Sequence, residues 1–158
     1  MSLIEEQIRE IGIELPETQA PVVGLLKPAR LLGRRLLISA QLPKRDNCII
    51  YTGKVGDTVD LATAQRATEL CALNVLAYAK EALDGDLGRI EAVAMVRGYV
   101  NVTPDFHAIA DVVNGASQLL LDVFGPVIGA HCRAAIGAAS MPFDATAEIE
   151  AEFYLLQE

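Results

Sequence analysis

Two segments near the C-terminus set the architecture: His131-Cys132-Arg133-Ala134-Ala135-Ile136-Gly137-Ala138-Ala139-Ser140-Met141-Pro142 and, after a short gap, Ala147-Glu148-Ile149-Glu150-Ala151-Glu152-Phe153. They predict two strands joined by a turn over residues 143–145. Pro142 ends the first strand because proline has no N–H to donate to a central ladder. In the second strand glutamates alternate with apolar residues, which is the side-chain period of a strand.

Arg133 lies at the start of the first of these strands, among small apolar residues. One interpretation is a structural ion pair between its guanidinium and a nearby carboxylate, and the residues alone favour it. The other is a planar fork that binds the carboxylate of a ligand through two parallel hydrogen bonds.

The pattern Arg133-x-x-Ile136-Gly137-x-x-x-Met141-Pro142, followed by a Glu-Ile-Glu strand, resembles the closing motif of the RidA/YjgF family. Proteins of this family are reactive-intermediate (imine) deaminases, also labelled L-PSP endoribonucleases. The likeness extends over nearly the whole chain and is greatest to a longer YjgF/chorismate-mutase-like subgroup with an additional N-terminal helix. It implies one domain over residues 1–158, in which residues 1–21 form that helix and a linker.

The composition suits one compact domain, with 52% hydrophobic residues in a chain of 158. The three cysteines are odd in number and match no zinc spacing, so we expect no metal site. Together with the lack of a signal-peptide core or a bilayer-length apolar run, they predict a cytoplasmic location. A net charge of −8 disfavours nucleic-acid and membrane partners. The one basic region, residues 27–45, lacks aromatic residues that could stack on bases, so we interpret it as a solvated rim.

Helix signals occur at three places. Ser2-Leu3-Ile4-Glu5 is a capping box that predicts a short amphipathic helix ending at Gly12. Residues 60–83 carry the longest apolar stripe, in which Cys71 is expected to be a small buried residue and Asn74 a hydrogen-bonded polar one. Thr103-Pro104-Asp105 predicts the start of a third helix, which Gly125 ends, with His107 off its buried stripe.

Strands are predicted at residues 22–32, 34–42, 48–51 and 90–102. The last is mostly apolar, and Arg97, which interrupts it, is expected to have a carboxylate partner. The order of elements predicts an α+β fold, with a mixed sheet and both long helices on one of its faces. The strand sequences are apolar on both faces, which predicts that the second face of the sheet is also buried against other protein surface.

The resemblance implies a chorismate-mutase-like fold that assembles as a homotrimer, with ligand clefts between neighbouring subunits and no cofactor. Arg133 stands where the family holds a substrate carboxylate, and Glu148 where a glutamate lies near the water that attacks the imine carbon. Three further residues stand at family cleft positions: Ala40 in Ser39-Ala40-Gln41, Asn114 in Val113-Asn114, and Ala135.

Three departures from the family pattern bear on activity. Residues 24–28 lack the aromatic that many members carry near the first strand, Ala40 replaces a glycine, and Ala135 replaces a cysteine. The resemblance still makes the leading hypothesis a hydrolase similar to 2-iminobutanoate/2-iminopropanoate deaminases, acting on small carboxylate-bearing enamines or imines. The alternative is a non-catalytic trimer that binds a small acid. An endoribonuclease is a third hypothesis, which the acidic chain and the lack of paired histidines disfavour.

Overall fold

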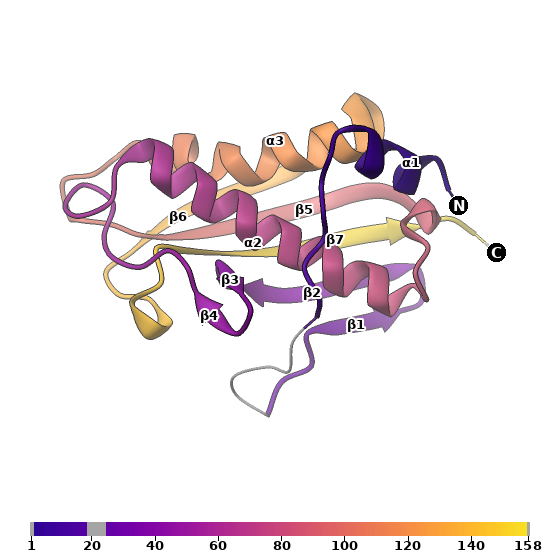
Figure 1. Cartoon of the computed structure of the whole chain (residues 1–158), viewed down its shortest axis with the longest axis horizontal. Helices are drawn as coiled ribbons and strands as arrows, with labels where there is room; N and C mark the ends of the chain where they lie inside the picture. The colour runs from indigo at the N-terminus through magenta and orange to yellow at the C-terminus, as the bar shows by residue number, and fades with distance from the viewer. Residues whose placement is uncertain (1, 19–24, 158) are drawn as a thin grey trace.

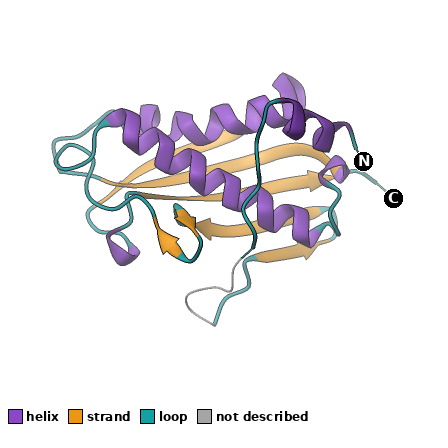
Figure 2. Ribbon diagram, in the orientation of Figure 1, coloured by secondary structure: helices purple, strands orange, loops and turns teal. Residues whose placement is uncertain are grey.

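A computed structural model describes residues 2–18 and 25–157. A mixed five-stranded sheet is covered on one face by two long helices, so the α+β prediction is confirmed (Figures 1 and 2). The helices are α1 (Leu3–Glu10), α2 (Leu61–Ala82) and α3 (Ile109–Ile128), with 3-10 turns η1 (Leu87–Arg89) and η2 (Pro142–Asp144). The strands are β1 (Ala29–Leu32), β2 (Arg35–Gln41), β5 (Ile90–Asn101), β6 (Cys132–Ala138) and β7 (Ala147–Leu155), and a small hairpin joins β3 (Lys44–Arg45) to β4 (Cys48–Ile49).

The order of strands across the sheet is β1-β2-β7-β5-β6. β5 pairs in parallel with β6, where Val96 lies opposite Arg133, and antiparallel with β7, where Tyr99 lies opposite Glu148. Both predicted C-terminal strands are therefore present, but β5 separates them. The turn between them has to carry the chain across β5, which a tight hairpin could not do.

α2 and α3 pack closely because Gly115 has no side chain. A Cβ at Gly115 would lie 2.1 Å from the carbonyl oxygen of Gln65. Beside this contact the Thr68 hydroxyl donates to the carbonyl of Val112 at 2.8 Å, which joins the two helices. A glycine that lowers the helix propensity of α3 is thus required by the approach of α2.

The predictions for Cys71 and Asn74 of α2 are confirmed. Cys71 is fully buried. Asn74 is also buried, and its Nδ2 donates to the carbonyls of Leu42 and Lys44 at 3.1 and 3.0 Å. These two bonds attach the β3–β4 hairpin to the helix layer.

α3 begins later than the sequence indicates. The chain is still extended at Thr103, whose N–H donates to the carbonyl of Val55 at 3.0 Å. It then turns through a hydrogen bond from the Phe106 N–H to the Thr103 carbonyl, and the helix begins at Ile109. The predicted break at Gly125 is confirmed by a φ of 75°, although one further turn continues to Ile128.

The boundaries of the other elements differ less. The capping box of Ser2 and Glu5 is formed, and α2 begins directly after its N-cap Asp60. The predicted strand over residues 22–32 begins at Ala29 in the described part, and its residues 22–24 lie outside the described residues, as do residues 19–21 of the predicted linker. No helix in the described part of the chain is long and apolar enough to cross a bilayer.

The face of the sheet opposite the helices is mixed, which corrects the expectation of apolar strands on both faces. Arg97 Nη1 pairs with Glu150 at 2.8 Å, as predicted, and Arg35 Nε pairs with Glu152 at 2.6 Å. Small apolar side chains of β6, such as Ala134, lie beside this charged ladder. We call this surface the open face.

Candidate functional site

Arg133 projects from edge strand β6 toward α3, on the helix-covered side of the sheet. Its Nη1 donates to Asn114 Oδ1 at 2.7 Å and to Ser117 Oγ at 3.2 Å. Asn114 and Ser117 are three residues apart on α3 and so lie on one side of the helix. The structure thus brings Arg133 to Asn114, two residues that the sequence placed in one site.

The guanidinium of Arg133 keeps one edge for a ligand. Nη1 carries two hydrogens, and the contacts with Asn114 and Ser117 use both. Nε and Nη2 have no hydrogen-bond partner among the described residues, and no described carboxylate forms an ion pair with this side chain. Nε and Nη2 form the side-on edge whose spacing matches the two oxygens of a carboxylate. Since Arg133 is exposed, that edge can be reached from solvent.

Two residues that the sequence analysis missed complete this cluster. Ser117 Oγ lies 2.9 Å from His131 Nε2, and His131 Nδ1 lies 2.6 Å from the carbonyl oxygen of Gly129. The available signal was spacing: His131 stands two residues before Arg133, and Ser117 stands one helical turn after Asn114. Only the packing of α3 beside β6 shows that the two side chains meet.

Glu148 lies elsewhere on the sheet. It alternates along β7 with Ala147 and Ile149, which are buried beneath the helices, so its carboxylate points to the open face. It is half-buried, and burial first and the charge of Glu150 second raise its pKa above the ordinary value. A carboxylate with a raised pKa is a stronger base.

The two alanines expected in the cleft are also separated. Ala135 follows Arg133 by two positions on β6, and it packs against the core on the same side of the sheet. Ala40 lies in an irregularity of β2 between Ile38 and Gln41, and β7 and β5 stand between its strand and β6. One chain therefore joins Arg133, Asn114 and Ala135, and leaves Ala40 and Glu148 apart from them.

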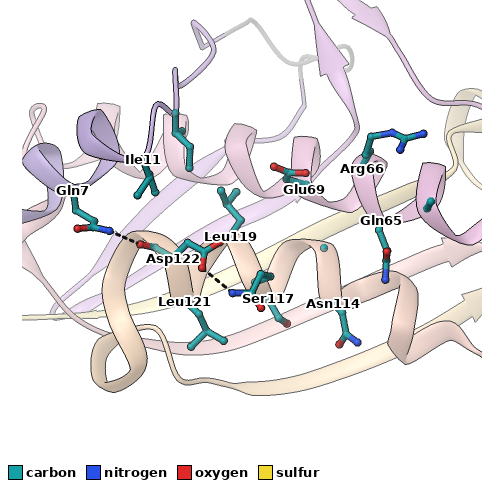
Figure 3. A pocket seen from close by; sticks show the side chains of 14 residues that line it. Gln7, Ile11, Gln65, Arg66, Glu69, Asn114, Ser117, Leu119, Leu121 and Asp122 are labelled. Carbon is teal, nitrogen blue, oxygen red and sulfur yellow. Dashed lines mark hydrogen bonds between the residues drawn. The ribbon is translucent and has the colours of Figure 1, made fainter.

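A groove of about 880 Å³ runs along the outer side of the helix layer, between α1, α2 and α3 (Figure 3). Asn114 and Ser117 belong to its lining, so the groove borders the Arg133 cluster. The rest of its lining is divided between polar side chains such as Gln65 and Gln118, which form hydrogen bonds of their own, and apolar ones such as Leu119.

Of the three cysteines, the buried Cys71 is poorly placed for chemistry. Burial raises the pKa of the Cys71 thiol well above its ordinary value, which keeps the thiol protonated and inert. Within residues 2–18 and 25–157, no three His, Cys, Asp or Glu side chains gather in a way that could hold a metal ion.

Comparison with known proteins gives consistent matches over nearly the whole chain. A family model described as "YjgF/chorismate_mutase-like, putative endoribonuclease" matches residues 5–155. Protein TCP17 of Trypanosoma cruzi is 37% identical over 148 residues, which cover 94% of this chain and 91% of that protein.

Two solved structures are similar in fold and sequence. The protein Atu1372 of Agrobacterium tumefaciens, of unknown function, has a TM-score of 0.88 at 44% identity. The match covers 98% of this chain and 94% of the chain of Atu1372. A protein of Shewanella oneidensis MR-1, described as a "putative endoribonuclease", has a TM-score of 0.91 at 29% identity. The match covers 98% of this chain and 100% of that protein's chain.

Proposed function

Because the chain belongs to the RidA/YjgF family, we propose that it hydrolyses small carboxylate-bearing imines, and the enamines that tautomerise to them, to 2-oxo acids and ammonia. The observation that carries the proposal is the Nε–Nη2 edge of Arg133, which has no partner among the described residues while Asn114 and Ser117 hold Nη1. A carboxylate adjacent to the C=N carbon would bind to that edge and fix the reacting carbon relative to the protein.

The reaction makes modest demands on the protein. An imine carbon is already electrophilic, so a water molecule adds to it once the water is oriented and loses a proton. Glu148 is the proposed acceptor of that proton, and its raised pKa favours the transfer. The imine nitrogen takes up a proton, the C–N bond of the resulting carbinolamine breaks, and one ammonia leaves for each water consumed.

The same proposal requires more than one chain. Arg133 lies on the helix-covered side and Glu148 on the open face, so a pocket with both needs the open face of a second subunit beside β6. We therefore propose a homotrimer with clefts between subunits, which agrees with the family resemblance. Sedimentation equilibrium at micromolar concentration is expected to give three times the chain mass of 16.9 kDa. A stable monomer would contradict the shared cleft.

The activity is tested by generating an imine in situ with an amino-acid oxidase and following release of the 2-oxo acid. We expect wild-type protein to accelerate this release and Arg133→Ala to abolish the acceleration. Arg133→Lys, which keeps the charge but loses the fork, is expected to retain only part of it. A folded trimer that accelerates nothing across several imine side chains would contradict the proposal.

The second candidate is a non-catalytic trimer that binds a small acid. One observation favours it: the Arg133 cluster is complete within one chain, whereas the proposed base is not part of it. Such a protein would bind 2-oxo acids through Arg133 and leave imine hydrolysis unchanged.

Endoribonuclease activity has less support. Two arginines of the basic region are neutralised by ion pairs, Arg34 with Glu91 and Arg35 with Glu152. The chain as a whole carries a net charge of −8, which repels a polyanion. RNA cleavage that survives stringent repurification and disappears in Arg133→Ala would favour this activity instead.

A further inference from the structure

A line of hydrogen bonds runs from the backbone of Gly129 through two side chains to Arg133. Gly129 O lies 2.6 Å from His131 Nδ1, His131 Nε2 lies 2.9 Å from Ser117 Oγ, and Ser117 Oγ lies 3.2 Å from Arg133 Nη1. His131 and Ser117 are half-buried, whereas Arg133 at the end of the line is exposed.

The chemistry of the groups gives this line one direction. A carbonyl oxygen can only accept, so the His131 proton resides on Nδ1 and points to Gly129. In the neutral imidazole Nε2 is then an acceptor, and the Ser117 hydroxyl has to donate to it. With its proton committed to His131, Ser117 Oγ turns a lone pair toward Arg133 and accepts from Nη1.

We propose that His131 and Ser117 are positioning residues for carboxylate recognition, a proposal that rests on the function proposed for Arg133. By fixing a lone pair of Ser117 toward Nη1, they orient the guanidinium plane so that its Nε–Nη2 edge faces the ligand. An exposed arginine otherwise occupies many rotamers, and ordering it at the moment of binding would cost affinity. Neither residue needs to touch the ligand or the reacting atoms.

The two ring nitrogens of His131 have different tasks, and this provides matched variants. His131→Gln places an amide near the position of Nε2, so an acceptor for Ser117 is kept. His131→Asn places an amide near Nδ1, so the bond to Gly129 is kept and the acceptor is lost. Ser117→Thr keeps the hydroxyl, whereas Ser117→Ala removes it.

The first test is calorimetric titration of each full-length variant with 2-oxobutanoate, with 2-oxobutanamide as the uncharged control. We expect Ser117→Ala and His131→Asn to weaken 2-oxobutanoate binding about five- to tenfold, the usual effect of losing one hydrogen bond. Ser117→Thr and His131→Gln are expected to stay within about twofold of the wild type. Binding of the amide, which does not use the charged fork, should change little in all four.

The outcomes separate the two proposals. If Arg133→Ala weakens binding but Ser117→Ala and His131→Asn do not, the positioning role is wrong and the function of Arg133 stands. Equal losses in His131→Gln and His131→Asn would show that the histidine only supports the loop. If Arg133→Ala binds 2-oxobutanoate as the wild type does, the function proposed for Arg133 is wrong, and the positioning role falls with it.

The second test needs no ligand. Long-range ¹H–¹⁵N NMR of the imidazole at a pH where it is neutral identifies which nitrogen carries the proton. The chain has only two histidines, so His107→Gln leaves His131 as the single signal. We expect the Nδ1–H tautomer in this variant and in its combination with Arg133→Ala. An Nε2–H tautomer would reverse the direction of the line and overturn the proposal.

Discussion

Arg133 and Glu148 lie on opposite faces of one sheet, with β5 between their strands. Arg133 meets α3 on the covered side, while Glu148 alternates with Ala147 and Ile149, which are buried on that side. If both residues act in one reaction, they have to come from different copies of the chain.

Mixing two inactive variants is expected to restore activity. In the proposed trimer, Arg133→Ala and Glu148→Gln would each disable every cleft. When the two variants are unfolded and refolded together in equal amounts, about a quarter of all clefts receive an intact Arg133 from one subunit and an intact Glu148 from the next. Imine hydrolysis by the refolded mixture is the measurement, with each variant refolded alone as the control. No recovery in verified mixed trimers would place both residues in the same subunit's site or remove Glu148 from it.

Replacing Arg133 is expected to affect binding far more than folding. The side chain is exposed, and its described partners are the side chains of Asn114 and Ser117, not a buried carboxylate. Arg133→Ala should therefore change the free energy of unfolding by less than about 1 kcal/mol. It should weaken 2-oxobutanoate binding by about tenfold or more, because charge-assisted hydrogen bonds are lost. Denaturant unfolding and calorimetry measure the two effects, and a variant that unfolds would indicate a structural role.

Glu148→Gln is expected to raise the melting temperature at pH 7. Because the pKa of Glu148 is raised by burial and by Glu150, the folded state binds this proton more tightly than the unfolded state does. Stability is therefore lost as pH rises from the ordinary glutamate value of 4.5 through the folded pKa. Glutamine removes that loss, so its advantage over the wild type should appear at pH 7 and vanish below about pH 4.

Glu152→Gln provides the control for this pH dependence. It lies on the same strand and face, but the hydrogen bond from Arg35 lowers the pKa of Glu152. Its carboxylate stabilises the fold at pH values above the ordinary glutamate pKa, and this stability is lost as pH falls through the lowered pKa of the folded state. The substitution should therefore lower the melting temperature slightly at pH 7. Equal effects of the two substitutions would contradict the assignment of Glu148.

Gly115→Ala is expected to destabilise the protein by about 1–3 kcal/mol, although alanine is the better helix former. The new Cβ would lie 2.1 Å from Gln65 O and 2.6 Å from Thr68 Oγ1, so α2 and α3 would have to separate. Urea unfolding measures the change. Gln118→Ala, at an exposed position of α3, is the control and should stay within about 0.5 kcal/mol of the wild type. An unchanged Gly115→Ala protein would show that the helices can shift without cost.

The sequence by itself determined the elements whose signals are local. The capping box of Ser2 defined α1, the apolar period over residues 60–83 defined α2, and the alternation of Glu148 with Ile149 defined β7. These signals are read over a few residues. The two helices also satisfy their backbone hydrogen bonds within the same segment, whereas β7 pairs with β2 and β5. The motif around Arg133 likewise identified the family, which the full-length comparison confirmed.

The tertiary structure decided everything that depends on a distant partner. Thr103 carries a helix-start signal, but a strand-like bond to Val55 delays α3, because backbone groups pair with whatever the fold brings near. Arg133 could have taken a carboxylate, and the placement of α3 beside β6 gave it Asn114 and Ser117 instead. The position of β5 between β6 and β7 separated the strand of Glu148 from that of Arg133. The order of strands and the contacts between helices depend on residues far apart in the chain, so the local sequence pattern does not predict them.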